Sequence, residues 1–264
     1  MSSFERRIEE YYERLGSELG WSDRIKREAI DERIRGTGGR HAAAELERYT
    51  ELRHKKVLDV GSGFGGFIVA ANKAGALVLG VEPDQERIEL CKMYLELNRV
   101  EKNLCVGVGQ YLPLKDNAVD VVTCYQVLEH TKNPTGLIRE MVRVLKPDGL
   151  LHITAPNYLY YREDHYRIFW IPLCPRPVAK LYLKMRKKKS SYFNSINYTT
   201  LLSIRRGLKA ANIKNIVDIT EEKMRNTDAI ISPKRRFICK LLKMLHLCHL
   251  ACFFRPRVQL IAKK

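Results

Sequence analysis

The sequence predicts an α/β fold: a mostly parallel sheet of seven strands with helices on both faces. Between residues 57 and 154, apolar runs of strand length alternate with helical patterns, which is typical of a parallel sheet with crossover helices. Two later apolar runs predict an antiparallel final pair. Charge divides unevenly along the chain: residues 1–150 hold 23 Lys and Arg against 24 Asp and Glu, and residues 151–264 hold 24 against 6.

Each expected strand is a short apolar run bounded by turn residues. These runs are 57–60, 77–81, 104–108, 119–125, 150–154, 213–219 and 258–262. Helical patterns lie between them at 67–73, 84–98 and 134–145. The sheet therefore accounts for most of the chain after residue 53.

Residues 1–52 predict a separate helical cover. Apolar residues recur at helical spacing from Phe4 to Leu15, and Ser22 is a natural N-cap for a helix over 23–35. Glycines at 36–39 predict a break before a helix at about 41–52. We expect residues 53–264 to form one further domain, with a sheet-rich half at 53–157 and insertions at 158–198 and 220–256.

The two insertions carry the basic excess. Residues 158–198, rich in Pro, Tyr and Lys, predict an irregular lid or binding insertion, and 233–254 predicts a basic amphipathic helix. Its charge-free stretch is about half of the ~20 residues that a membrane span needs. Such a surface is typical of contact with an anionic membrane or, alternatively, with nucleic acid; a merely solvated surface is the third interpretation.

The strand at 57–60 opens through Gly61, Gly63 and Gly65 into a helix. Glycines admit a ligand close to the backbone because they have no Cβ. The next strand ends at Glu82, where a carboxylate could hold the two hydroxyls of a ribose.

Together with later motifs, these segments resemble class I S-adenosylmethionine-dependent methyltransferases of the type 11 kind over about residues 55–157. The later motifs are Leu112-Pro113-Leu114, Asn117 to Val122, Val127-Leu128-Glu129-His130 and Arg143 to Gly149. The resemblance implies a Rossmann-like sheet, with 53–157 as its cofactor half. A dinucleotide enzyme is the nearest alternative, but a second glycine loop of that kind is missing from the sequence.

By this resemblance the cofactor is S-adenosylmethionine, and its expected contacts come from the ends of the first strands. The candidate cofactor-binding residues are Asp59, Gly61, Ser62, Gly63, Gly65, Glu82, Pro83, Gly109, Gln110 and Gln126. The family commonly places an acidic residue where this chain has Val108, and the side-chain oxygen of Gln110 could replace it at the adenine.

His130 is the first candidate for a general base, and His165 in the insertion is the second. Alternatively, Glu129-His130 only holds the turn after the fourth strand, since methyl transfer can rely on positioning of the reactants. No metal is expected: a related branch of quinone O-methyltransferases binds a divalent ion with a Glu three residues before its Glu-His pair, and this chain has Gln126 there.

Other site classes are less well supported. The turn after the fourth strand, Cys124 to Val127, lacks the Asn/Asp-Pro-Pro-aromatic motif of amino-methylating nucleobase enzymes. Cys248, His249 and Cys252 could share a helix face as zinc ligands, but a second ligand cluster is missing, so a buried helix face is the default. Seven scattered cysteines without a Cys-x-x-Cys pair predict reduced thiols in the cytoplasm.

The sequence thus predicts O-methylation of a small or lipid-linked acceptor, of saccharide type, by a cytoplasmic protein, peripheral on the inner face of a membrane. The likeness of 156–172 to enzymes of cell-envelope saccharides suggests that acceptor. RNA methylation, and a non-catalytic protein that binds RNA or membrane through its basic half, are the alternatives.

Overall fold

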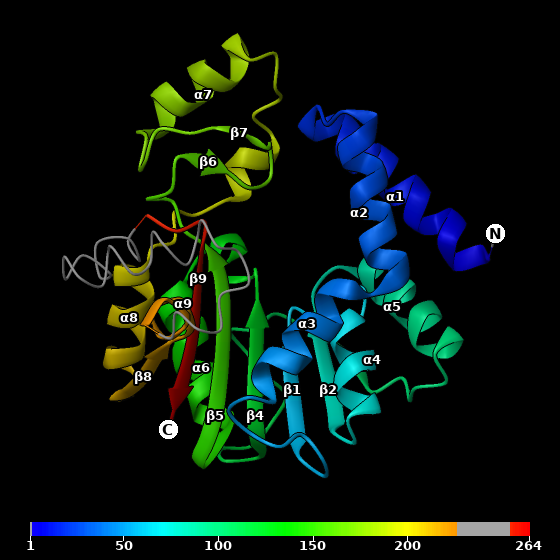
Figure 1. Ribbon diagram of the computed structural model, residues 1–264, viewed down its shortest axis with the longest axis vertical. Helices are drawn as coiled ribbons and strands as arrows, with labels where there is room; N and C mark the ends of the chain where they lie inside the picture. The colour runs from blue at the N-terminus through cyan, green and yellow to red at the C-terminus, as the bar shows by residue number, and fades with distance from the viewer. Residues whose placement is uncertain (1, 226–253) are drawn as a thin grey trace.

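The computed structural model describes residues 2–225 and 254–264. Its main sheet has seven strands in the order β3-β2-β1-β4-β5-β9-β8 (Figure 1). The strands are β1 Lys56–Val60, β2 Leu77–Glu82, β3 Leu104–Val106, β4 Val119–Tyr125, β5 Leu145–Pro156, β8 Asn215–Asp218 and β9 Arg257–Lys263. Pairs among β1 to β5 are parallel, and β9 runs antiparallel to β5 and β8. The predicted fold class is confirmed.

Alternating side chains of the central strands build a core on each face of the sheet. Leu58 and Val122 pack against helices α6 and α8, whereas their neighbours Val57 and Val121 pack on the α4 side. This period of two places successive residues on opposite faces. The helices on the two faces are α4 Gly66–Lys73, α5 Gln85–Leu97, α6 Pro134–Val144, α8 Leu201–Ala210 and α9 Ile219–Arg225.

The N-terminal cover consists of α1 Ser3–Leu19, α2 Asp23–Arg35 and α3 Thr37–Leu46. Ser2 and Glu5 form a capping box that starts α1. The expected bounds of the helix at 41–52 are wrong at both ends: α3 begins at Thr37, directly after Gly36, and ends at Leu46. A Cβ on Gly39 would lie 2.1 Å from the Gly66 carbonyl; the glycines therefore let α3 pack closely on α4 rather than break the chain.

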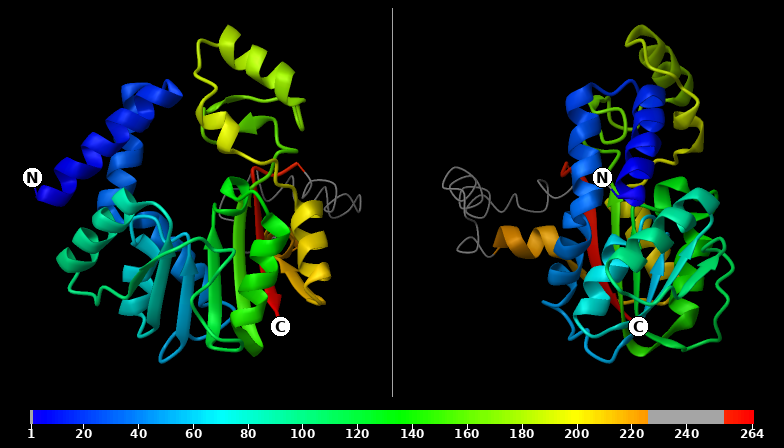
Figure 2. Two further views of the ribbon diagram at one scale, coloured as in Figure 1. Left: turned by 180° about the vertical axis from the view of Figure 1, so that it is seen from behind. Right: turned by 90° about the vertical axis from the view of Figure 1, so that its right-hand side faces the viewer.

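The insertion at 158–198, called the cap below, was predicted to be irregular, but it contains regular secondary structure. It contains β6 Arg162–Glu163, β7 Ile168–Phe169, α7 Arg176–Met185 and the 3-10 turn η2 Tyr192–Ser195. Its own hydrophobic cluster centres on Tyr166, Trp170 and Phe193, and it includes Leu19 from α1. Figure 2 shows the cap standing above one edge of the sheet, beside the tip of the α1-α2 pair.

Part of the second insertion lies outside the described residues. This applies to the expected helix at 233–254, apart from Phe254, and to Cys248, His249 and Cys252. Within 2–225 and 254–264, no helix is both long and apolar enough to cross a membrane.

Candidate active site

The loop after β1 has the backbone conformation that the glycines predict. Gly61, Gly63 and Gly65 all have positive φ, at 72°, 53° and 80°, which other residues adopt only at a cost. A Cβ on Gly61 would lie 2.2 Å from Val127 Cγ2, and one on Gly65 would lie 2.7 Å from Cys91 Sγ. At Gly63, by contrast, nothing lies within 4 Å of that position. The loop therefore has open space above its middle glycine.

Glu82, at the end of β2, lies beside this loop. Its side chain is buried, and its Oε2 accepts a hydrogen bond from the Gly63 N–H at 2.9 Å. Its Oε1 accepts one from the Asp84 N–H at 3.2 Å. Asp84 in turn caps α5. Pro83, between them, is exposed. The carboxylate is thus held at the edge of the open space by two backbone donors.

Asp59 and Ser62 face into the protein rather than into the open space. Asp59 Oδ1 accepts a hydrogen bond from the Thr123 hydroxyl of β4 at 2.7 Å. Burial raises the pKa of Asp59 to about 7. The Ser62 hydroxyl lies against β2, 2.9 Å from where a Cβ on Gly80 would be. Asp59 therefore joins β1 to β4 behind the loop, whereas the Ser62 hydroxyl has no hydrogen-bond partner among the described residues.

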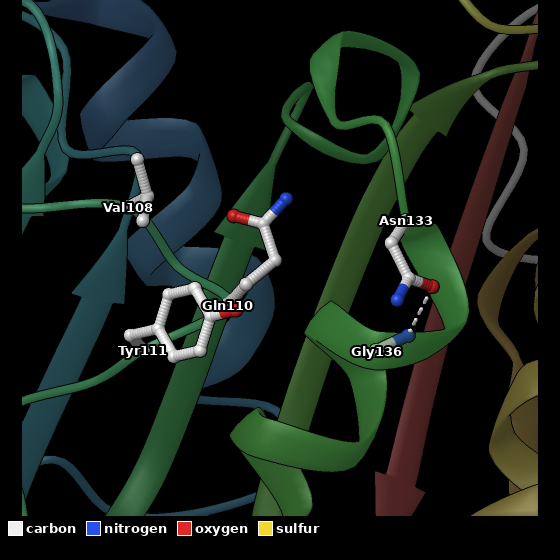
Figure 3. Close-up of a pocket in the computed structure, with 5 residues that line it drawn as sticks. All are labelled: Val108, Gln110, Tyr111, Asn133 and Gly136. Atoms are coloured by element: carbon white, nitrogen blue, oxygen red, sulfur yellow. Dashed lines mark hydrogen bonds between the residues drawn. The ribbon is translucent and has the colours of Figure 1, made fainter.

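A cavity of about 510 Å³ opens past the end of β3. Its lining residues are Val108, Gln110, Tyr111, Asn133 and Gly136 (Figure 3). Gln110 Nε2 donates to the Thr131 hydroxyl, so the carboxamide connects the loop after β3 to the loop after β4. Gly109 lies behind the cavity, since a Cβ there would be 2.6 Å from Leu137 and 2.8 Å from Val60.

Gln126 follows β4 and is exposed with a φ of 57°. Its N–H donates to the Thr154 carbonyl of β5 at 2.8 Å. Its side chain therefore extends from a strained turn at the same edge of the sheet. The turn η1, Leu128–His130, follows directly.

The two candidate bases lie side by side although 35 positions separate them in sequence. The ring centroids of His130 and His165 are 5.3 Å apart, and the two rings are nearly perpendicular. The ring centroid of Tyr192 lies 5.9 Å from that of His130 and 5.3 Å from that of His165. Burial lowers the pKa of His130 to about 3. His130 is therefore neutral at ordinary pH.

A carboxylate that the sequence did not single out holds His165. Glu163 Oε1 lies 2.8 Å from His165 Nδ1 and accepts a hydrogen bond from the Tyr158 hydroxyl at 3.0 Å. Its Oε2 accepts the Tyr166 N–H at 2.6 Å. Burial opposes the charged imidazole, but the hydrogen bond and the charge of Glu163 outweigh it and raise the pKa of His165. The Glu-x-His spacing was the signal available in the sequence.

Glu129, before His130, is fully buried, and neither of its oxygens has a hydrogen-bond partner among the described residues. Burial raises its pKa to about 7. Glu129, His130 and His165 bring ligand atoms within 4.8 Å of one another, a spacing that a metal ion could use. The expectation of no metal depended on Gln126 alone and did not foresee that His165 joins this pair.

The N-terminal cover contacts both halves of this site. Tyr11 packs edge-on against Phe64 of the glycine loop and accepts a hydrogen bond from Arg87 Nε at 3.1 Å. At the other end of α1, the Trp21 indole donates to the His165 carbonyl at 2.6 Å. Sequence patterns predicted these helices but not that they join the loop to the cap.

Comparison with known proteins agrees with this geometry. Residues 58–153 match a family described as a methyltransferase domain. A ubiquinone biosynthesis O-methyltransferase of Neisseria meningitidis is 30% identical over 116 residues, covering 42% of this chain and 48% of that protein. One from Coxiella burnetii is 32% identical over 120 residues, covering 44% and 51%. The match thus spans about half the length of these curated relatives.

Solved structures share the fold over more of the chain. A putative sarcosine dimethylglycine methyltransferase from Galdieria sulphuraria covers 97% of this chain and 98% of its own at a TM-score of 0.58, with 18% identity. An S-adenosylmethionine-dependent methyltransferase from Mesorhizobium loti covers 87% and 100% at 0.56, with 14% identity. Residues 58–153 therefore match a methyltransferase domain, and the chain shares the fold of these solved methyltransferase structures.

Proposed function

We propose that this protein transfers the methyl group of S-adenosylmethionine to an oxygen of a small or lipid-linked acceptor. The observation that carries the proposal is the pair of histidines at the edge of the sheet, with His165 fixed by the buried carboxylate of Glu163. An imidazole held in this way can accept a proton from a hydroxyl. The names of the curated relatives also favour oxygen as the nucleophile.

The residues after β1, β2 and β3 fit the cofactor. The open position above Gly63 admits a ligand against the backbone, and the adjacent Glu82 carboxylate can accept hydrogen bonds from two ribose hydroxyls. Gln110 lines the neighbouring cavity, which is where an adenine would lie if it follows the ribose. The bound cofactor supplies an electrophilic methyl group on a sulfonium.

His165 is the better placed base of the two. Its Nδ1 faces Glu163, which leaves Nε2 for the proton of the acceptor hydroxyl. Nε2 of His165 would accept that proton while the hydroxyl oxygen takes up the methyl group that bound S-adenosylmethionine would supply. His130, neutral and next to His165, then orients the acceptor rather than holding the proton.

The cap supports an acceptor with a lipid or saccharide part. The half-buried ring of Tyr192 lies beside both histidines, and such a ring can stack on a sugar ring. The basic excess of residues 151–264 favours work at an anionic membrane surface, with the protein in the cytoplasm.

The direct test uses a membrane extract, S-adenosylmethionine with a labelled methyl group, and mass spectrometry of the products. We expect a lipid-soluble product that gains one methyl group with the wild type and at least a hundredfold less with His165→Asn. Glu96→Gln, an exposed change on α5, is the control and should behave as the wild type. Label that appears only in RNA would contradict the proposed acceptor and support RNA methylation.

A further inference from the structure

Exposed apolar side chains are concentrated on the cap. Of the fifteen large apolar residues that are exposed in the described chain, seven lie between positions 161 and 185. They are Tyr161, Phe169, Ile171, Leu173, Val178, Leu181 and Met185, with exposed fractions from 46% to 74%. A folded protein rarely leaves such a cluster in water without a binding partner.

Three of these residues form one stripe of α7. Val178, Leu181 and Met185 recur at helical spacing on one side, whereas Ala179 and Leu183 on another side are buried in the cap. Tyr182, next to the stripe, donates its hydroxyl to the Phe169 carbonyl at 2.9 Å. This bond brings the Phe169 segment of β7 beside the stripe. We call Val178, Leu181, Met185, Phe169 and Ile171 the apolar face of the cap.

The charges around this face are of one sign. Residues 158–198 contain nine Lys and Arg against two acidic residues. Glu163 is buried with His165, and Asp164 accepts a hydrogen bond from Arg257 at 3.0 Å. Lys180, Lys184, Arg186, Lys187 and Lys189 are all exposed. An apolar stripe bordered by lysines is the pattern of a helix that lies in the surface of an acidic bilayer.

The place of the cap in the molecule fits this partner. Figures 1 and 2 show α7 as the part of the cap farthest from the sheet, and Figure 1 shows the cap above the β5 and β9 side of the sheet. His165 belongs to the same compact unit as α7. A bilayer against α7 therefore lies on the side of the protein where an acceptor would reach the histidine pair.

We propose that the apolar face of the cap is a docking surface for an acidic lipid bilayer, into which Val178, Leu181 and Met185 insert while the surrounding lysines contact lipid headgroups. The inference rests on the proposed function only for the purpose of the surface, which is to bring the protein to a lipid-linked acceptor. It is separate from the basic segment at 233–254, which lies almost wholly outside the described residues.

The test is co-sedimentation of the full-length protein with vesicles of phosphatidylcholine alone or mixed with phosphatidylglycerol. We expect binding to the acidic vesicles that weakens as salt is added. The variant Val178→Ser/Leu181→Ser/Met185→Ser should bind at least tenfold more weakly because the inserted apolar area is lost. Leu202→Ser, at an equally exposed leucine of α8, should bind as the wild type.

A second pair of variants tests the charges. Lys180→Gln/Lys184→Gln/Lys187→Gln should weaken binding roughly a hundredfold, since each cation near such a surface contributes roughly fivefold. Lys115→Gln/Lys209→Gln/Lys214→Gln makes the same change of net charge at exposed positions outside the cap, and it should bind several times more tightly than the first variant. Equal affinity of these two variants, or wild-type binding by the serine variant, would overturn the docking surface.

Two further measurements separate this inference from the proposed function. His130→Asn should bind vesicles as the wild type does, although it impairs methyl transfer. The serine variant should bind S-adenosylmethionine with unchanged affinity, which also shows that it is folded. Salt-sensitive binding to RNA with none to acidic vesicles would contradict the docking surface and name nucleic acid as the partner of the basic half.

Discussion

At the scale of single residues, Glu82 connects the glycine loop to the expected ribose position. Replacing it with Ala removes a charged acceptor that is worth about 1.5–3 kcal/mol in hydrogen bonding. We therefore expect affinity for S-adenosylmethionine to fall between about tenfold and a hundredfold, as measured by isothermal titration calorimetry. The exposed Glu96→Ala is the control. Unchanged affinity in Glu82→Ala would remove Glu82 from the cofactor site.

Glu163 and His165 predict a particular pH dependence. A base works in its neutral form, so the rate should rise as pH increases through the pKa of His165, which Glu163 and its hydrogen bond raise. Glu163→Gln removes that charge; the acidic limb of the pH–rate profile should move to lower pH, and kcat should fall. His130→Asn should lower the rate without moving that limb, because the pKa of His130 is about 3. A limb that stays in place in Glu163→Gln would contradict the role of His165.

We also expect methyl transfer to proceed without a metal ion. Glu129, His130 and His165 could contact one, but Gln126 supplies no carboxylate, and transfer from a sulfonium can depend on positioning alone. Dialysis against EDTA should therefore leave turnover unchanged. Loss of activity that added Mg²⁺ or Zn²⁺ restores would show that the histidine pair and Glu129 bind a metal.

At the scale of elements, the glycine loop separates effects on binding from effects on stability. A side chain at Gly63 projects into open space, so Gly63→Val should abolish cofactor binding at a cost of about 1–3 kcal/mol in stability, due to its positive φ. Gly61→Val should destabilise the fold more, because its Cβ would overlap Val127. Denaturant unfolding and calorimetry measure the two effects. Tight binding by Gly63→Val would contradict the placement of the cofactor.

The join between the N-terminal cover and the cap is the second element to test. Trp21→Phe keeps an aromatic ring against Tyr12 but removes the hydrogen bond to the His165 carbonyl. We expect a loss of about 0.5–1.5 kcal/mol of stability in urea unfolding. We also expect turnover to fall more than cofactor affinity, because the bond holds the cap and not the loop. An equal fall of both would show that α1 and α2 act on the cofactor instead.

The elements also show what the sequence could and could not predict. The central strands β1, β2, β4 and β5 were predictable because each contains a largely buried apolar run. Gly61 to Gly65 directly follow β1, and Glu82 ends β2. The start of α3 was missed because Gly39 serves close packing on α4, and Gly38 lies against the Glu32 side chain of α2, rather than breaking the helix. Glu163 was missed because it gains its partner only when the cap folds into a compact unit.

At the scale of the whole molecule, the cofactor loop and the basic surface belong to different parts of the chain. Residues 1–150 are nearly neutral, and the positive excess begins after β5. Added salt should therefore weaken membrane binding strongly and cofactor binding little. This difference allows the methyltransferase claim to be tested in solution, without lipid and without knowledge of the acceptor.

The most direct measurement is isothermal titration of the purified protein with S-adenosylmethionine, followed by S-adenosylhomocysteine. The proposed function predicts one site per chain with a dissociation constant in the micromolar range, which corresponds to a binding free energy of about −8 kcal/mol. It also predicts that Gly63→Val abolishes this binding. No heat of binding up to millimolar S-adenosylmethionine, from protein that unfolds cooperatively, would contradict it and favour a non-catalytic protein with a methyltransferase fold.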